Sequence, residues 1–364
     1  MKQHVTRRWL GALVLVLAVT PGLLAQGGRP IVTVASTVPS NGDVNPYGVA
    51  IVPVSMGNLV AGHILVSNFN NSSNLQGTGT TIVDIAPNGA TSLFAWIDAG
   101  SLPGQCPGGV GLTTALVALR AGFVIVGSLP TTDGMSDTAQ AGCLIVLNSS
   151  GTVVSTIVNS LINGPWDMAA LDMGATADLF VTNVLNGTVA GGGNLVDEGT
   201  VVRVNLAFPS TVKPVVVSFT TIGSGFPERT DPAALVIGPT GVGLAPDGTL
   251  YVADSLNNRI ASIADAATRT SSAGLGATVF QGPHMNDPLG LTVRASNGDI
   301  LTVNGNNGLL VETSAGGTQI ATRLLDESGT PPGAGALFGL ATTPQGLYFV
   351  DDATNTLNLL ANIP

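Results

Sequence analysis

The segment Pro239 to Ile260 constrains the fold of this chain more than any other feature of its sequence. It reads as two short strand-like runs joined by the turn Pro246-Asp247-Gly248, followed by a polar corner and a third run. A glycine in such a turn supplies the positive φ angle that a tight hairpin requires. Degenerate copies of the segment recur along the chain, and repeated sheets of this kind must bury their faces against one another.

The copies share one register. In each copy a small residue opens the second strand-like run, and a polar residue follows six positions later; a third run comes next, and a fourth follows in most copies. Six copies that each supply four strands predict an all-β, six-bladed β-propeller with four-stranded antiparallel blades. The six pairs are Gly62 and Asn68, Gly122 and Ser128, Ala177 and Asn183, Gly248 and Asp254, Gly298 and Asn304, and Gly346 and Asp352.

The two ends of the chain predict how the ring closes. The last copy stops at Pro364 after three strand-like runs, whereas an additional run, Pro30 to Ser36, precedes the first copy. A blade that lacks one strand leaves an unpaired sheet edge, which a strand from elsewhere in the chain can cover. We therefore expect the N-terminal strand to join the last blade.

The first 25 residues are interpreted as a signal peptide. A basic start with Lys2, Arg7 and Arg8 precedes an apolar run that is too short to span a bilayer, and small residues end it at Ala25. A general secretory signal is the main interpretation and a twin-arginine signal the alternative. The prediction is a secreted or periplasmic protein without membrane insertion after cleavage, in which residues 26–364 form a single propeller domain.

Charge restricts the partners of the chain. It contains 12 Lys/Arg and 22 Asp/Glu, for a net charge of −10, and three of the basic residues lie in the predicted signal peptide. Nucleic-acid binding requires clustered cations that release counterions, and the remaining basic residues are scattered. We expect a monomer that binds a protein or a small molecule and does not bind nucleic acid.

Two cysteines, Cys106 and Cys143, lie in the second copy of the repeat. Disulfides persist in exported proteins, so a structural bridge between two loops of one blade is possible, although spacing alone does not establish pairing. A catalytic thiol is less consistent with the sequence, because no nearby base is identifiable for either cysteine.

The fourth copy resembles NHL-repeat propellers and, more distantly, gluconolactonase-like and strictosidine-synthase-like proteins. It carries Pro-x-Gly-Val, Pro-Asp-Gly, Tyr-Val-Ala-Asp and Asn-Asn-Arg-Ile in that order. The resemblance implies a six-bladed propeller. It also implies, for gluconolactonase-like relatives, a divalent metal held by Glu, Asn and Asp at the variable position of Pro-x-Gly, directly before its glycine. Those positions are not metal ligands here, and only His63 and His284 follow the predicted signal peptide, so neither cofactor nor metal is predicted.

Two rings of residues are expected around the central opening, on the face where innermost strands begin and second strands end. The inner ring is read either as an apolar funnel for a ligand or as a plug of the channel. The outer ring is read either as a polar collar around a ligand or as a set of structural corner residues. The inner-ring candidates are Tyr47, Trp166, Thr240 and Phe338, with Leu112 and Leu289; the outer-ring candidates are Asn68, Asn183, Asp254, Asn304 and Asp352, with Ser128.

The two rings lead to two hypotheses about the function of the protein. The main interpretation is a non-catalytic module that binds a ligand or a protein at the face of Tyr47, Trp166 and Phe338. The alternative is a secreted or periplasmic lyase or hydrolase that uses carboxylates of the same face, such as Asp167 and Asp254. Asp287 and Asp352 are further carboxylates expected at this rim.

Overall fold

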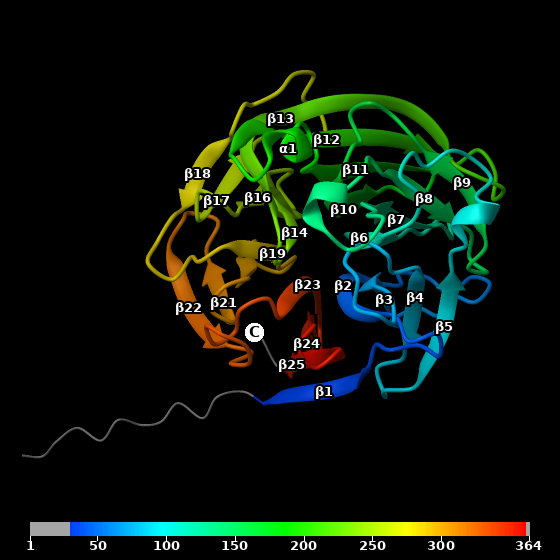
Figure 1. Cartoon of the computed structure of the whole chain (residues 1–364), viewed down its shortest axis with the longest axis horizontal. Helices are drawn as coiled ribbons and strands as arrows, with labels where there is room; N and C mark the ends of the chain where they lie inside the picture. Colours follow the sequence, from blue (N-terminus) through cyan, green and yellow to red (C-terminus); the bar gives the residue numbers. More distant parts are fainter. Residues whose placement is uncertain (1–29, 362–364) are drawn as a thin grey trace, which may run out of the picture.

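The protein is an all-β ring of six sheets arranged around a central axis, as predicted. The computed structural model describes residues 30–361, so the predicted signal peptide lies outside the described residues. Figure 1 shows the sheets following one another around the ring in chain order. Between residues 30 and 361, helical segments are confined to α1 (Thr188–Gly191) and the 3₁₀ turns η1 (Ala99–Ser101) and η2 (Ser136–Thr138). Within the described residues, no helix has the length and apolar character needed to cross a membrane.

Each blade is an antiparallel sheet whose innermost strand comes first in the chain, except that blade six takes its outermost strand from the N-terminal part. The strands of blades one and two are β2 (Val44–Ile51), β3 (Ile64–Asn70), β4 (Thr81–Ile85), β5 (Thr91–Trp96), and β6 (Leu112–Ala118), β7 (Val124–Ser128), β8 (Cys143–Leu147), β9 (Val153–Ile157). Those of blades three and four are β10 (Pro165–Asp172), β11 (Thr176–Asn183), β12 (Val196–Ala207), β13 (Val215–Asp231), β14 (Leu235–Ile237), and β15 (Pro239–Leu244), β16 (Leu250–Asp254), β17 (Arg259–Ile263), β18 (Ala277–Phe280). Those of blades five and six are β19 (Pro288–Val293), β20 (Ile300–Asn304), β21 (Leu309–Thr313), β22 (Gln319–Leu324), and β23 (Leu337–Thr343), β24 (Gly346–Asp351), β25 (Thr356–Ala361), β1 (Ile31–Ser36).

Strand β1 pairs antiparallel with β25 at the outer edge of blade six. Ile31 lies opposite Leu360 and Ser36 lies opposite Thr356, so the sheet order is β1-β25-β24-β23. The backbone amide of Thr37 also donates to the carbonyl of Asn355 at 3.0 Å. The two ends of the described chain therefore lie in the same sheet.

Blade three departs from the four-strand pattern. Strand β13 is 17 residues long and continues beyond its pairing with β12, and its last residues pair with the short strand β14. Leu235, the first residue of β14, adopts a positive φ of 63°, which is uncommon for a residue with a large side chain. The extension carries Arg229 and Asp231 from the outer edge of blade three to the face where the innermost strands begin.

The glycine of the Pro-x-Gly motif is explained by the packing of neighbouring blades. A Cβ atom on Gly290 would overlap the carbonyl oxygen of Phe338, and one on Gly339 would overlap the carbonyl oxygen of Tyr47. Innermost strands of adjacent blades thus touch backbone to backbone at this level. Only glycine allows that approach, so the motif marks the ring contact rather than a ligand site.

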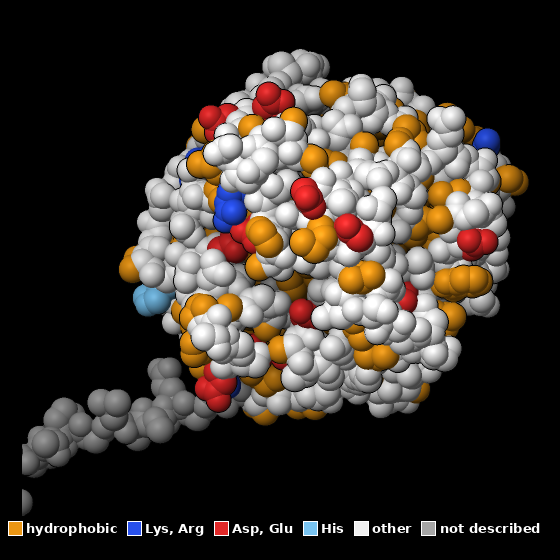
Figure 2. Space-filling model, in the orientation of Figure 1, with side chains coloured by type: hydrophobic (Ala, Val, Ile, Leu, Met, Phe, Trp, Pro, Cys, Tyr) orange, Lys and Arg blue, Asp and Glu red, His pale blue; other side chains and the backbone are white. Residues whose placement is uncertain are grey.

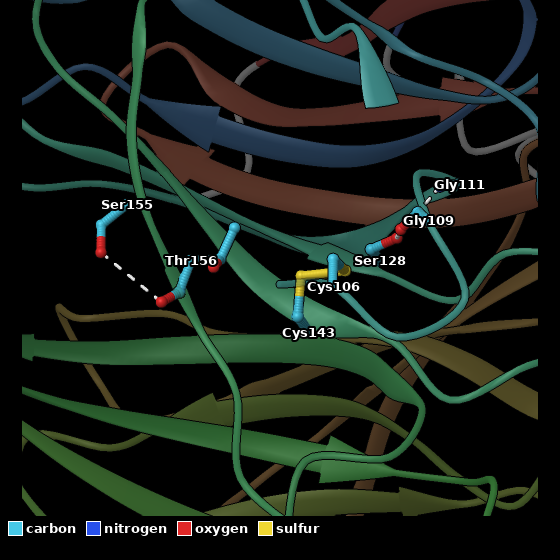
Figure 3. The surroundings of a disulfide bond; sticks show 7 residues. All are labelled: Cys106, Gly109, Gly111, Ser128, Cys143, Ser155 and Thr156. Atoms are coloured by element: carbon cyan, nitrogen blue, oxygen red, sulfur yellow. Dashed lines mark hydrogen bonds between the residues drawn. A yellow bond between two sulfur atoms is a disulfide. The ribbon is translucent and has the colours of Figure 1, made fainter. Parts of the chain in front are cut away.

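A disulfide joins Cys106, in the loop before β6, to Cys143 at the start of β8, with their Cα atoms 5.3 Å apart. Figure 3 shows the bridge beside Ser128, which ties the same loop down. The Ser128 hydroxyl donates to the carbonyl of Gly109 at 2.9 Å and accepts from the amide of Gly111 at 3.0 Å. The loop is therefore fixed both covalently and by hydrogen bonds.

Replacing both cysteines by alanine is expected to lower the free energy of unfolding by about 2–4 kcal/mol, because the bridge closes a loop of 37 residues. Guanidinium unfolding of the oxidised wild type and the double variant measures the difference. A reduced wild type should match the variant. Equal stability of the oxidised and reduced proteins would contradict the prediction.

Candidate functional site

The predicted inner-ring residues lie at the starts of the six innermost strands and so surround the axis. Tyr47 is in β2, Trp166 in β10, Thr240 in β15 and Phe338 in β23, and all four are buried. Figure 1 shows β2, β6, β10, β19 and β23 arranged about the centre of the ring. The register read from the sequence therefore brings these side chains together.

The aromatic members pack against one another. Tyr47 is stacked between Phe69 and Phe338, with ring centroids 4.3 Å and 3.9 Å away, and Trp166 lies at 6.5 Å. We call these four residues the aromatic plug. Tyr47 and Phe338 are each 4% exposed and Trp166 is 5% exposed, so the plug fills the channel at the level of the strand starts. Burial raises the pKa of Tyr47 well above its usual value.

Thr240 is the polar member of the inner ring, and its hydroxyl connects two blades. Its Oγ1 donates to the carbonyl of Pro288 at 2.9 Å and lies 2.7 Å from the Oγ of Ser255. Ser255 Oγ donates to the same carbonyl at 2.6 Å. These bonds fasten blade four to blade five and leave the hydroxyl fully buried.

The outer-ring residues hold the corners of their blades. The amide of Asn68 donates to the carbonyl of Thr37 at 3.0 Å, and that of Asn304 donates to the carbonyl of His284 at 2.6 Å. Asn183 bonds within its own strand. The Oδ1 atoms of Asn68, Asn183, Asp254 and Asn304 are buried and have no hydrogen-bond partner within residues 30–361. These observations describe corner residues, and a polar collar around a ligand remains a prediction.

The two acidic members of the outer ring differ. Asp254 is fully buried and pairs with Arg259, whose Nε lies 2.7 Å from its Oδ2, so its charge is already matched. Asp352 is half-buried; burial, followed by the charge of Asp351, raises its pKa to about 7. Asp167 lies in the channel on the other side of the aromatic plug. The carboxylates that the sequence placed at one rim therefore occupy three different environments.

A cavity of about 520 Å³ opens beside the aromatic plug, on the face where the innermost strands begin. We call it the side pocket. Leu289 and Phe338 of the inner ring form part of its apolar wall, and the extension of blade three supplies its charged wall. Figure 2 shows acidic and hydrophobic side chains interspersed near the centre of the molecule. The pocket residues used below are Arg229, Asp231, Asn258, Asp287, Leu289 and Phe338.

Asp287 is the carboxylate of the side pocket. It precedes β19 in a left-handed conformation, with φ of 55°, which is uncommon for a residue with a side chain. Its amide donates to Asn258 Oδ1 at 2.6 Å, and its carbonyl accepts from the amide of Gly305 at 2.7 Å. Its carboxylate makes no hydrogen bond to the residues that the structure describes. The backbone is thus pinned while the acid group stays available.

The surroundings of Asp287 in the side pocket raise the pKa of its carboxyl group toward neutral pH. Burial, followed by the charge of Asp231, raises its pKa to about 6, whereas Arg229 acts in the opposite direction. Arg229 pairs with Asp231 at 2.7 Å and remains one-third exposed. A carboxylate with this pKa can exchange protons near pH 7, and a neighbouring guanidinium can stabilise developing negative charge. The repeat pattern placed Asp287 at this rim, but it gave no signal for Arg229 or Asp231.

The residues at the strand starts do not fit a divalent metal. Gluconolactonase-like relatives are expected to use carboxylate and amide oxygens there, whereas this chain presents the stacked rings of Tyr47 and Phe338, the indole of Trp166 and the side chain of Leu289. Calcium requires six or more oxygen ligands. The two histidines bond elsewhere, His63 to Asp84 and His284 to Gln319. Within residues 30–361, no three His, Cys, Asp or Glu residues cluster as a metal site would require.

Comparison with solved structures places the fold in a known class. No protein-family model matches the chain, and no curated protein matches it in sequence. A gluconolactonase from Xanthomonas campestris is similar at a TM-score of 0.56 and 11% identity, over 92% of this chain and 89% of that one. A virginiamycin B lyase from Staphylococcus aureus has a TM-score of 0.52 and 12% identity, over 92% and 99%. Regucalcin from Agrobacterium tumefaciens, a calcium-binding protein, has a TM-score of 0.50 and 13% identity, over 90% and 93%.

The predicted resemblance to gluconolactonase-like and NHL-like propellers is confirmed at the level of the fold. Identities between 11% and 13% carry no residue-by-residue transfer of an active site. The chain is therefore a six-bladed β-propeller whose site has to be argued from its own residues.

Proposed function

We propose that this protein is a hydrolase or lyase that uses Asp287 in the side pocket as its general acid–base. One observation carries the proposal: the Asp287 carboxylate is partly buried, lacks a hydrogen bond to described residues and has a pKa raised to about 6. Buried acid groups with pKa values near the working pH concentrate at catalytic sites. Lactone hydrolysis and lyase chemistry are both carried out by proteins with this fold, which supports an enzymatic role.

The side pocket suggests the class of substrate. Its volume suits a small molecule, and Leu289 and Phe338 offer an apolar surface to the carbon skeleton. Arg229 would face a carbonyl or carboxylate oxygen, where its charge stabilises the oxyanion that forms during the reaction. Ionised Asp287 would remove a proton from water, for hydrolysis, or from a carbon next to the carbonyl, for elimination. The substrate is therefore a small lactone, ester or carbonyl compound.

Replacing Asp287 by Asn is expected to lower kcat/KM by at least about 100-fold, because general acid–base catalysis contributes that much or more. The measurement is turnover of a panel of aliphatic lactones, aryl esters and β-substituted carbonyl compounds. Wild-type kcat/KM should rise as the pH increases through about 6, where Asp287 loses its proton. Asp247→Asn is the matched control, because Asp247 lies exposed in the hairpin turn between β15 and β16 and does not line the side pocket.

Two outcomes would reject the enzymatic proposal. Turnover that persists in the Asp287→Asn variant would assign catalysis to another group. Absence of turnover across the panel, together with retained binding of a panel compound, would favour the non-catalytic binding module that the sequence suggests.

We also propose that the protein acts outside the cytoplasm as a monomer. The disulfide between Cys106 and Cys143 supports an oxidising compartment, where such bridges persist. Cell fractionation and the intact mass of the mature protein test export and cleavage near Ala25. Light scattering of the purified protein tests the oligomeric state.

A further inference from the structure

A second cavity lies on the axis, beyond the aromatic plug from the side pocket. It has a volume of about 650 Å³ and is lined by the innermost strands of all six blades. We call it the lower channel. Asp167 follows Trp166 of the plug and so marks its inner end. Arg120, in the turn after β6, and Asp172, the last residue of β10, mark its mouth.

Most of the residues that line the lower channel have apolar side chains, and small residues among them leave the space open. Val49, Leu116, Met168, Val242, Leu291 and Leu340 contribute hydrocarbon from the six blades. Four small residues lie among them and leave space for the cavity on the axis: Ala50, Ala170, Gly243 and Gly339. A cavity of this size and composition suits a small organic molecule.

Asp167 is the one acidic group at the inner end of the lower channel. The residue is 8% exposed; its Oδ1 accepts from the amide of Met168 at 2.8 Å, and its Oδ2 accepts from the amide of Val242 at 3.0 Å. It forms no ion pair with any residue between 30 and 361. Burial raises its pKa to about 7, partly opposed by the two amide donors. Thr114 lines the same cavity, and its buried hydroxyl also has no partner among the described residues.

We propose that the lower channel binds an organic cation, with an ammonium group against Asp167 and an apolar body along the channel wall. A buried carboxylate without a counter-charge is costly, and a ligand cation offsets that cost in a medium of low dielectric. A divalent metal fits less well, since Asp167 is the one carboxylate at the inner end and no three His, Cys, Asp or Glu residues cluster within residues 30–361. An anionic ligand would be repelled by Asp167. The site is independent of the side pocket, from which the aromatic plug separates it.

Calorimetric titration of the full chain with benzylamine tests the proposal, and benzyl alcohol is the neutral isostere. Benzylamine should bind at least about tenfold more tightly than benzyl alcohol at pH 8, consistent with one desolvated charge pair. The preference should vanish in Asp167→Asn. Ala170→Phe, which fills the channel without altering Asp167, should abolish binding of both compounds.

The pH dependence provides a second readout. Benzylamine affinity should fall about 100-fold between pH 8 and pH 5, because Asp167 is protonated below about 7. The other charged groups lining the lower channel are Arg120 and Asp172, which pair at the mouth. The Asp287→Asn variant should bind benzylamine as the wild type does.

Three results would overturn the proposal. These are equal affinity for the amine and the alcohol, unchanged binding in Ala170→Phe, and loss of benzylamine binding in Asp287→Asn. The last would place the amine in the side pocket. If Asp167→Asn fails to fold, benzylamine binding to Ala170→Phe and the pH dependence of wild-type binding still test the proposal.

Discussion

Raising the pH from 5 to 8 is expected to lower the free energy of unfolding by about 6 kcal/mol, the reverse of ordinary acid denaturation. The cause is a pair of buried acids that keep their protons in the folded protein. Burial raises the pKa of Asp167 to about 7 and that of Glu228 to about 8. Each pH unit between the unfolded and folded pKa values contributes about 1.4 kcal/mol per group.

The sign follows from proton binding in the two states. In the unfolded chain both groups titrate near their model values, 3.8 for Asp167 and 4.5 for Glu228, so they are ionised above about pH 5. The folded protein holds their protons up to about 7 and 8. It therefore binds more protons than the unfolded chain in this window, and its stability declines as the pH rises through the folded pKa values. Glu228 is fully buried, and its Oε1 accepts from the amide of Asn186 at 2.8 Å.

Urea unfolding at pH 5, 6, 7 and 8 measures this dependence. The Glu228→Gln variant keeps an acceptor for Asn186 and removes the titration, so its stability should decline less steeply and exceed that of the wild type at pH 8. Asp247→Asn, at an exposed turn, should follow the wild type. A wild-type stability that is flat or rises between pH 5 and 8 would show that these acids are ionised in the fold.

Replacing Tyr47 by Ala should cost about 3–5 kcal/mol of unfolding free energy, the usual range for removing a large buried aromatic side chain. Tyr47 is the central ring of the aromatic plug, stacked on both Phe69 and Phe338. Its removal loses two ring pairs, each contributing about 0.5–1.5 kcal/mol beyond burial, and leaves a cavity where blades one and six meet.

Chemical denaturation of the Tyr47 variants gives the magnitude. Tyr47→Phe keeps both stacked pairs and should change the stability by less than about 1 kcal/mol. Trp96→Ala is the surface control, since Trp96 is 63% exposed at the edge of blade one. If Tyr47→Ala unfolds at the wild-type denaturant concentration, the ring of Tyr47 lies in an open funnel rather than in a packed plug.

The sequence predicts the fold well because most copies of the repeat encode the same contact between neighbouring blades. Gly290 and Gly339 lie where neighbouring innermost strands touch, so no other residue is tolerated and the Pro-x-Gly pattern stays visible. The six-residue register likewise positions Asn68, Asn304 and the other corner residues, which secure loops through hydrogen bonds. Positions with a shared structural task are those that a repeat reveals.

The candidate site is harder to predict from the sequence because several of its residues lie where one blade departs from the repeat. Arg229 and Asp231 reach the side pocket on the extension of β13, a feature of one blade only. Asp254 was grouped with the available carboxylates, yet Arg259 neutralises it; the two residues lie five positions apart across one turn, and that spacing is readable in the sequence. The opposite environments of Asp167 and Asp287 depend on which side of the plug each carboxylate faces.

The aromatic plug also determines what can pass through the molecule. Because Tyr47, Trp166 and Phe338 pack against one another between the two cavities, we expect the side pocket and the lower channel to be reached from opposite faces. In that arrangement a solute that enters one opening is expected to leave by the same opening. Two different molecules can therefore occupy the protein at once, and saturation of one opening should leave access to the other unchanged.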